Sequence, residues 1–322
     1  MRTLPTMTAP PHATSARARL ALDLPAYVLA GITLTGFLGR WHWLLDLTSH
    51  FRWYWLLAAV VWFAVAARRQ SRPALASLAL AIAANAAAIL PSWLPPADAS
   101  AAGDRLEIVA LNVFIDNHEQ DRVLAYLRQR DADVVVLVEV DASWARAIET
   151  LAPLYPHRVV EPRDDKFGIA VLAKLPLETP RVERVAAGPP VILATLPRGE
   201  RGCLLVAAHP QAPITAAWSA RRDAQLAALG DIAAAESRPV IVAGDLNATP
   251  WSHGFRRLVG PRGLRDSALG RGLQPTWNAR SWVPRIPIDH VVVSPEVQVI
   301  SRTIGPDVGS DHLPVEATLL VP

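Results

Sequence analysis

Six short stretches of this 322-residue chain place polar residues where a hydrophobic run begins or ends. They are ALN (110–112), VEV (138–140), AAHP (207–210), AGDLN (243–247), IDHV (288–291) and GSDHLP (309–314). Together they supply Glu139, Asp245, Asp289, Asp311, His209, His312, Asn112 and Asn247. One such stretch alone is usually a turn. Six in one chain predict a shared site, because functional side chains gather where a rigid scaffold meets its loops.

These residue types suit the hydrolysis of a phosphate ester. Carboxylate oxygens are ligands for Mg²⁺, which takes one or two from the protein and leaves its other positions to water and substrate phosphate. Zinc sites use more histidine and cysteine than this set offers. Histidine and asparagine can donate hydrogen bonds to phosphoryl oxygens as charge develops on them. We therefore expect metal-assisted phosphoester hydrolysis with Mg²⁺, or with Mn²⁺ as the alternative ion.

Strand-like patterns dominate the chain after residue 104. Strands are expected at 105–113, 133–140, 157–161, 167–174, 190–197, 202–210, 239–247, 288–294, 297–304 and 312–320, and helices at 118–130, 141–151 and 216–235. Several strands follow one another without a helix between them. This order predicts an α/β domain of two packed sheets with helices outside, rather than a barrel or a doubly wound sheet.

The order N…E…H…GDxN…DH…SDH resembles the endonuclease/exonuclease/phosphatase superfamily. The resemblance spans residues 105–320, and GDLN (244–247) and SDH (310–312) are its most specific parts. It implies the DNase I-like fold, a four-layer α/β sandwich with two mixed β-sheets. The apolar region ahead of this domain is similar to that of a membrane-attached bacterial branch of the superfamily.

The resemblance implies that Glu139 is the main metal ligand, assisted by Asn112 and Asp311. Many relatives carry an acid two residues after the first asparagine. Here that position is Phe114, and the nearest acid is Asp116. This departure puts a second metal contact at that end in question.

The resemblance also implies five catalytic residues. Asp245 would activate or align the attacking water, and Asn247 would position the phosphate. His312, oriented by Asp289, would contact the scissile phosphate in acid–base chemistry. His209 would donate to the phosphoryl oxygens or serve the leaving group. Which histidine is the acid and which the base stays open.

Other polar residues have plainer interpretations. Arg221 and Arg222 lie in the predicted helix 216–235, and arginines in such places usually form solvated ion pairs. His290 is expected to pack beside its strand. Cys203 is the only cysteine, so an intramolecular disulfide and a cysteine metal cluster are excluded.

Three apolar runs, 20–38, 53–67 and 73–94, precede the catalytic region. A spanning helix needs about 20 apolar residues, and tryptophans lie near the ends of the runs, where interfacial aromatics are expected. We predict about three transmembrane helices. The expected organisation is a cytoplasmic basic tail at 1–19, a membrane anchor at 20–94, a linker at 95–104 and the catalytic domain at 105–322.

The loop charges predict the orientation of this anchor. The N-terminal tail and the link ARRQSR (67–72) are rich in arginine and should face the cytoplasm. Three crossings then place the catalytic domain on the extracytoplasmic, or periplasmic, side of the inner membrane. The lipid bilayer is thus an expected partner, and no obligatory protein partner is evident.

The distribution of charge bears on the substrate. Residues 1–103 carry eight arginines and three acids, a balance of +5, so the total of +3 leaves −2 for residues 104–322. The catalytic region therefore lacks the excess positive charge of an indiscriminate nucleic-acid binder. A lipid head group or a soluble phosphoester is favoured. The alternatives are a membrane-attached nuclease acting on extracytoplasmic nucleic acid and, less favoured, a catalytically silent binding module of the same fold.

Overall fold

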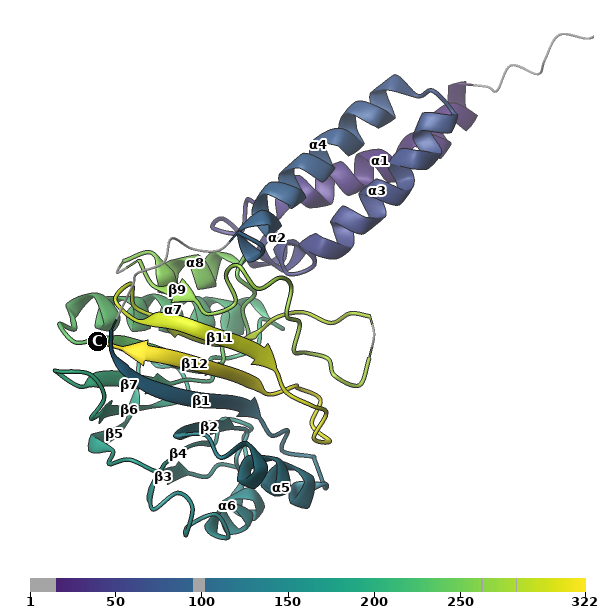
Figure 1. The fold of residues 1–322 in the computed structure, drawn as a ribbon. Coiled ribbons are helices and arrows are strands. Elements are labelled where there is room, and N and C mark those ends of the chain that lie inside the picture. The colour runs from purple at the N-terminus through teal and green to yellow at the C-terminus, as the bar shows by residue number, and fades with distance from the viewer. Residues whose placement is uncertain (1–15, 95–101, 262, 282) are drawn as a thin grey trace, which may run out of the picture.

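The computed structural model describes residues 16–94, 102–261, 263–281 and 283–322 (Figure 1). Two six-stranded mixed sheets form the catalytic region. The first has the order β11 (Gln298–Ile304), β12 (Val315–Val321), β1 (Asp104–Asn112), β2 (Val134–Val138), β4 (Ile169–Ala173), β3 (His157–Glu161). The second has the order β5 (Glu178–Arg184), β6 (Pro190–Leu196), β7 (Cys203–Ala207), β8 (Val240–Asp245), β10 (Asp289–Val293), β9 (Arg265–Asp266).

The main core lies between the two sheets. Along β1, Leu106, Ile108 and Ala110 point into this inter-sheet core, whereas Val109 and Leu111 face the opposite side. Such a strand is buried on both faces, which explains its nearly continuous hydrophobic sequence.

Helices cover the outer face of each sheet. The first sheet packs against α5 (Gln120–Arg130) and α6 (Ala142–Glu149), and the second against α7 (Ala216–Ala235) and α8 (His253–Val259). The four layers confirm the predicted sandwich of two mixed sheets flanked by helices.

Strand directions bring the termini of five strands, from both sheets, to one end of the sandwich. β1 and β2 are parallel, so they end together at Asn112 and Val138. β8 ends at Asp245, directly opposite Asp289, which begins the antiparallel β10. β12 runs antiparallel to β1, and Val315 pairs with Ala110. The segment entering β12 therefore arrives where β1 ends.

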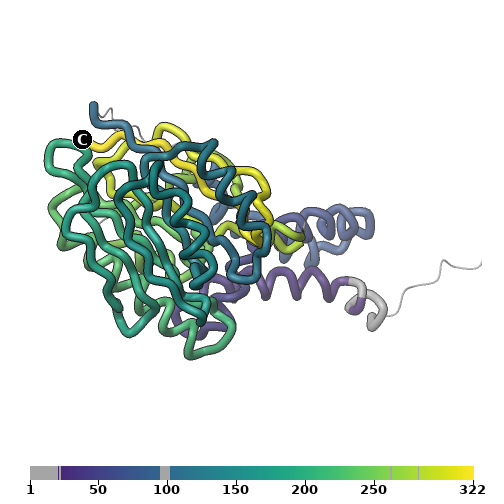
Figure 2. The backbone as a smooth tube through the Cα atoms, turned by 90° about the horizontal axis from the view of Figure 1, so that it is seen from below, coloured from purple at the N-terminus to yellow at the C-terminus, as the bar shows by residue number. Residues whose placement is uncertain are grey.

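The three apolar runs form helices, as expected. They correspond to α1 (Ala16–Thr35), α3 (Arg52–Arg68) and α4 (Arg72–Ile89), which is extended by the short 3₁₀ helix η1 (Leu90–Ser92). A further short helix, α2 (Trp43–Ser49), lies in the connection from α1 to α3. The helices form a bundle that projects away from the sheets in two perpendicular views (Figures 1 and 2).

The number of membrane spans stays a prediction. By length and composition, one helical segment of the described chain, Arg72–Ser92, could cross a membrane. The pair Trp43–Ser49 and Arg52–Arg68, bent by 65°, would add a second if it acted as one span. Three spans are therefore not established. Residues 1–15 and 95–101, most of the predicted tail and linker, lie outside the described residues.

Candidate active site

Asp245 lies at the centre of the cluster formed by the predicted residues. Its Oδ2 accepts a hydrogen bond from Asn112 Nδ2 at 3.1 Å and faces His209 Nε2 at 3.5 Å and His312 Nε2 at 3.7 Å. Its Oδ1 accepts from the backbone N–H of Asn247 at 2.9 Å. Burial by itself raises the pKa of Asp245, but His312 and His209 outweigh it and hold that pKa below its usual range. The carboxylate is therefore ionised at neutral pH.

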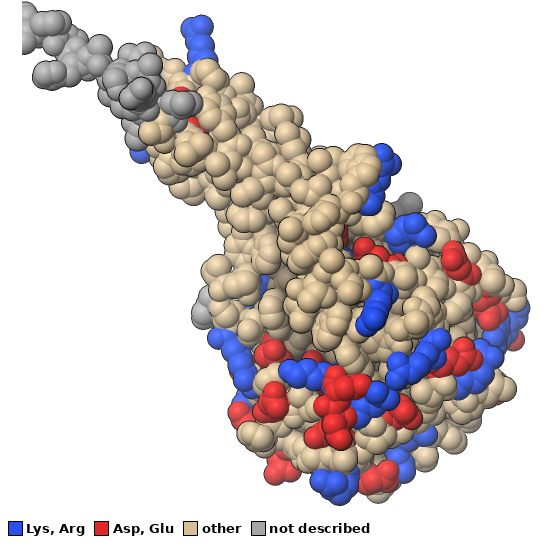
Figure 3. All heavy atoms as spheres, turned by 180° about the vertical axis from the view of Figure 1, so that it is seen from behind, with Lys and Arg blue, Asp and Glu red and all other residues tan. Residues whose placement is uncertain are grey.

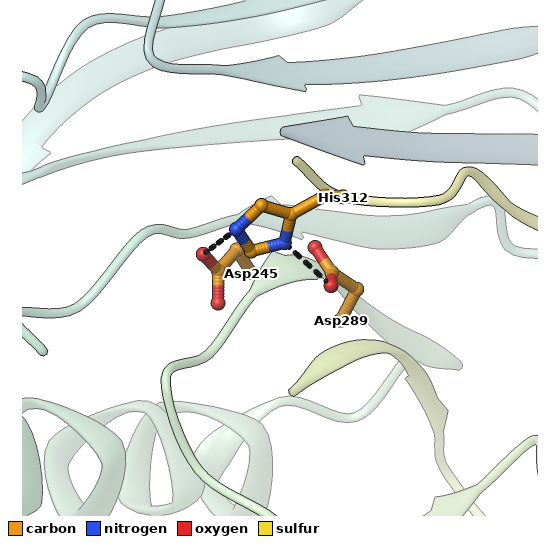
Figure 4. Close-up of side chains that lie close together, drawn as sticks. All are labelled: Asp245, Asp289 and His312. Atoms are coloured by element: carbon orange, nitrogen blue, oxygen red, sulfur yellow. Dashed lines mark hydrogen bonds and ion pairs between the residues drawn. The ribbon is translucent and has the colours of Figure 1, made fainter. Parts of the chain in front are cut away.

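His312 lies between two carboxylates, with Asp289 on one side of the ring and Asp245 on the other (Figure 4). Its Nδ1 is 2.8 Å from Asp289 Oδ2. Burial by itself lowers the pKa of His312, but the charges of Asp289 and Asp245 raise it to about 10. The imidazolium form, with a proton on each nitrogen, is thus favoured at neutral pH, and Asp289 fixes the ring in place.

Glu139 reaches the cluster through Asn112. Asn112 Nδ2 donates to Glu139 Oε1 at 3.0 Å as well as to Asp245, while Asn112 Oδ1 accepts from the backbone N–H of Phe114 at 2.9 Å. The backbone N–H of Ile115 donates to Glu139 Oε2 at 3.1 Å. Asn112 thus joins two carboxylates, and its role as a metal ligand stays a prediction.

Asp311 adds an acid whose surroundings fit a cation. Its Oδ2 accepts from Trp277 Nε1 at 3.2 Å, but its buried Oδ1 has no hydrogen-bond partner in the described part of the chain. Burial, together with the charges of Glu139 and Asp245, raises the pKa of Asp311 above its usual range, although His312 and the Trp277 N–H lower it. A bound cation would give Asp311 Oδ1 an interaction partner. It would also offset the negative charges of Glu139 and Asp245 beside it.

A second group of possible metal ligands is formed by Asp245, Asp289 and His312, whose ligand atoms lie within 4.8 Å of one another. Both nitrogens of His312 face carboxylate oxygens of this group, an arrangement in which a ring nitrogen directs a proton at the carboxylate rather than a lone pair at a metal. A metal requires an unprotonated histidine nitrogen. We therefore interpret this group as an acid–histidine–acid array, and metal binding by Glu139 and Asp311 stays a prediction.

The GDLN turn is shaped by its backbone. Gly244 has φ +138°, and a Cβ at this position would lie 2.1 Å from the carbonyl oxygen of Ala208, so only glycine fits. Asn247 has φ +49°, a left-handed conformation that asparagine tolerates better than most residues. Its Nδ2 donates to the carbonyl of Pro210 at 3.0 Å, which ties this turn to the segment that carries His209.

The eight predicted residues form one connected cluster at the end of the sandwich where strands of both sheets meet. His209, buried beside Phe167, contacts Asp245, and His312 Nε2 lies 4.0 Å from Asp311 Oδ1. The individual roles given to these residues remain predictions, because proximity alone does not assign a role.

The sequence model of the endonuclease/exonuclease/phosphatase family matches residues 109–312, more than half of the chain. The chain belongs to this family. Family membership places it among hydrolases of phosphoester bonds. Among curated proteins, the sequence has no significant match.

Solved structures share the fold of this family member. A D. rerio TDP2 humanized by 14 mutations is 20% identical, with a TM-score of 0.58, over 67% of this chain and 98% of that one. A Beutenbergia cavernae endonuclease/exonuclease/phosphatase is 23% identical, with a TM-score of 0.56, over 67% and 72% of the two chains. The human Nocturnin catalytic domain, with bound sulfate, is 19% identical, with a TM-score of 0.56, over 68% and 98%.

Several supporting residues of this family site escape prediction from sequence. Ser310 donates its hydroxyl to the carbonyl of Asn112 at 2.7 Å and accepts from the backbone N–H of His312 at 3.0 Å. The indole N–H of Trp277 donates the hydrogen bond that fixes the Asp311 carboxylate. Arg222, expected to be solvated, is fully buried, and its guanidinium donates to the carbonyl of Asn247 at 3.0 Å. The prediction that Arg222 is solvated is therefore wrong, because this side chain is buried against the backbone of the GDLN turn.

Proposed function

We propose that this protein is a metal-dependent hydrolase of phosphate esters, acting as a phosphodiesterase or a phosphatase. The observation that carries the proposal is the meeting of Asp245, the Asp289–His312 pair and Asp311 where the ends of the two sheets come together, with no hydrogen-bond partner for Asp311 Oδ1 among the described residues. Acidic, imidazolium and amide groups in one place can bind a phosphoryl group and activate a water.

The metal-ligand residues in this proposal are Glu139 and Asp311, with Asn112 assisting. A Mg²⁺ or Mn²⁺ ion bound there supplies positive charge for the phosphoryl oxygens. Loss of the Glu139 carboxylate should weaken metal binding.

The remaining residues act on the water and the phosphate. Asp245 aligns the attacking water and accepts its proton. His312, held by Asp289, donates a hydrogen bond to a phosphoryl oxygen as negative charge grows on it. His209, which faces the same oxygen of Asp245 as His312 does, provides a second donor, and Asn247 positions the phosphate.

The surface charge favours a lipid or small phosphoester substrate. Basic and acidic side chains alternate over the face of the catalytic domain in Figure 3, with no continuous basic stripe on that face. A D. rerio TDP2 structure of the same fold holds a single-strand DNA product, which keeps a nuclease as the alternative function. A silent binding module is disfavoured, because every predicted catalytic residue is present in the cluster.

Metal dependence tests the proposed function. The full chain should hydrolyse bis(p-nitrophenyl) phosphate or p-nitrophenyl phosphate in the presence of Mg²⁺ or Mn²⁺. EDTA should abolish the activity, and excess Mg²⁺ should restore it. Glu139→Gln should raise the Mg²⁺ concentration for half-maximal rate at least about tenfold. The matched control Glu161→Gln, at the end of β3, should behave as wild type. Hydrolysis that persists in EDTA would contradict the proposal.

We further propose that the helical bundle tethers the enzyme to a membrane. Of the 18 large hydrophobic side chains that are exposed in the described part of the chain, 14 lie between Leu24 and Leu94. The surface of the bundle in Figure 3 is almost free of charge between its two ends. An exposed apolar surface of this kind suits lipid acyl chains. With 18 residues in α4, that helix is about 27 Å long, close to the thickness of a hydrocarbon core.

The direction of the helices supports an extracytoplasmic catalytic domain. α1 runs toward the domain, α3 away from it and α4 toward it again (Figure 1). The basic turn between α3 and α4, with Arg68, Arg69 and Arg72, therefore lies at the end of the bundle far from the domain. Basic segments usually remain in the cytoplasm, so we infer that the domain lies on the opposite side of the inner membrane.

Reporter fusions test the tether and its orientation together. Alkaline phosphatase fused after Pro322 should be active in bacteria, because this reporter requires export, and green fluorescent protein at the same point should be dark. The full chain should float with phosphatidylethanolamine–phosphatidylglycerol vesicles, whereas residues 104–322 should not. A fluorescent fusion with an inactive phosphatase fusion would overturn the orientation, and a full chain that fails to float would overturn the tether.

A further inference from the structure

The short helix α2 brings a buried acid from the bundle against the catalytic domain. Asp46 is 1% exposed, and its Oδ2 accepts from Arg222 Nη2 on α7 at 2.8 Å. Its Oδ1 accepts from the backbone N–H of His253, the first residue of α8, at 2.7 Å. Asp46 thus joins both helices that cover the second sheet.

Arg222 continues this contact toward the active site. The residue is fully buried, and its guanidinium donates through Nη1 to the carbonyl oxygen of Asn247 at 3.0 Å and through Nε to Asp223 at 2.9 Å. The planar guanidinium can satisfy Asp46 and Asn247 at once only in a fixed orientation. Asp46 therefore fixes the position of the Arg222 guanidinium, which donates to the carbonyl of Asn247.

Asn247 is the point at which this contact meets the reacting groups. Its backbone N–H donates to Asp245 Oδ1, its side chain donates to Pro210, and its carbonyl accepts from Arg222. Its left-handed backbone, with φ +49°, is held by these three bonds. Loss of the hydrogen bond from Arg222 removes one of the three bonds that hold Asn247, the residue proposed to position the phosphate.

A second contact between the bundle and the domain leads to Asp311 independently. Tyr54 at the start of α3 accepts from the backbone N–H of Arg285 at 2.5 Å and donates to the carbonyl of Arg285 at 3.2 Å. The Arg285 guanidinium donates to the carbonyl of Ala279 at 2.7 Å, and the Ala279 N–H donates to the carbonyl of Asp311 at 2.7 Å. The bundle thus contacts the supports of both Asn247 and Asp311.

We propose that the domain-facing end of the bundle is part of the catalytic apparatus, with Asp46 as a positioning residue that acts through Arg222 on Asn247. This inference rests on the proposed function of the site. It assigns the N-terminal helices a role beyond tethering: the hydrolytic site is fully formed only when α2 is docked.

Kinetics of the full chain in detergent micelles test this proposal, with bis(p-nitrophenyl) phosphate and Mg²⁺ as the probe. Asp46→Asn preserves shape but removes the charge that orients Arg222. It should lower kcat by about 10- to 100-fold with little change in KM, because a slightly misplaced phosphate contact affects the transition state most. The matched control is Asp23→Asn, another acid of the bundle that pairs with an arginine, Arg69, at 3.2 Å. This control should keep wild-type kcat.

Non-additivity separates positioning from a general loss of stability. Asp46→Asn combined with Asn247→Ala should be no slower than Asn247→Ala alone, since Asp46 acts through Asn247. Independent, multiplying losses would overturn the proposal. Arg222→Lys provides a second variant if Asp46→Asn folds poorly. It keeps the charge but loses the fork that joins Asp46 and Asn247, so the same fall in kcat is expected.

Hydrogen exchange gives a readout that does not depend on turnover. In Asp46→Asn, backbone amides of residues 245–249 should exchange faster than in wild type or in Asp23→Asn. Unchanged exchange together with wild-type kcat would overturn the inference. If wild type hydrolyses nothing, the proposed function fails by itself, and the exchange result still decides whether Asp46 orders the GDLN turn.

Discussion

Asp245→Asn lowers kcat/KM by about 10²- to 10⁴-fold, the range expected when a positioned acid or base is removed. The substitution keeps the size of the side chain but replaces the charge that faces His209 and His312. An amide cannot accept the proton of the attacking water, and it no longer favours the imidazolium form of His312. The measurement is steady-state hydrolysis of a chromogenic phosphodiester at saturating Mg²⁺.

Asp116→Asn is the matched control for this variant. Asp116 is the acid closest in sequence to Phe114, and its side chain is exposed. We expect its removal to leave kcat/KM near the wild-type value. An Asp245→Asn variant that is as active as Asp116→Asn would contradict the catalytic assignment.

Arg222→Met destabilises the full chain by about 3–5 kcal/mol, the usual cost of removing one partner of a buried ion pair. The loss is large because Asp46, 1% exposed, is left inside the protein without the guanidinium that pairs with it. The carbonyl of Asn247 loses its donor in the same step. Chemical unfolding in detergent, followed by tryptophan fluorescence, measures the free energy of unfolding.

The neighbouring residue supplies the control. Arg221 is exposed, so Arg221→Met should change the free energy of unfolding by less than about 0.5 kcal/mol. Replacing both charges, as in Arg222→Met with Asp46→Leu, should recover part of the loss, because no uncompensated charge stays buried. Equal stabilities of the Arg221 and Arg222 variants would show that the pair contributes nothing.

Much of the catalytic region can be predicted from sequence because its strands are buried on both faces. Runs such as VVVLV in β2 have no competing interpretation as surface segments. The site is predictable for a related reason: GDLN and SDH place charged residues directly at the ends of such runs. The edge strand β5 escapes prediction, since all seven of its residues are exposed and its sequence ETPRVER shows neither alternation nor a hydrophobic run.

The contact between bundle and domain cannot be predicted in the same way. Asp46 and Arg222 are 176 residues apart, and each lies in a helix where a charged side chain ordinarily faces water. Nothing local distinguishes Arg222, which is buried, from Arg221, which is exposed. Only the packing of α2 against α7 and α8 separates them. Apolar composition likewise predicts the helices of the bundle but not the number that cross a membrane.

The pairing of β1 with β12 has a consequence for how the enzyme is made. The two strands are neighbours over seven register pairs, from Asp104 with Val321 to Ala110 with Val315. More than 200 residues of chain must therefore emerge before β1 gains this partner, and contacts so distant in sequence form slowly. His312 precedes β12 and arrives equally late. A partly synthesised chain thus holds Asn112 and Glu139 without His312, and the cluster around Asp245 is complete only after β12 has joined the sheet.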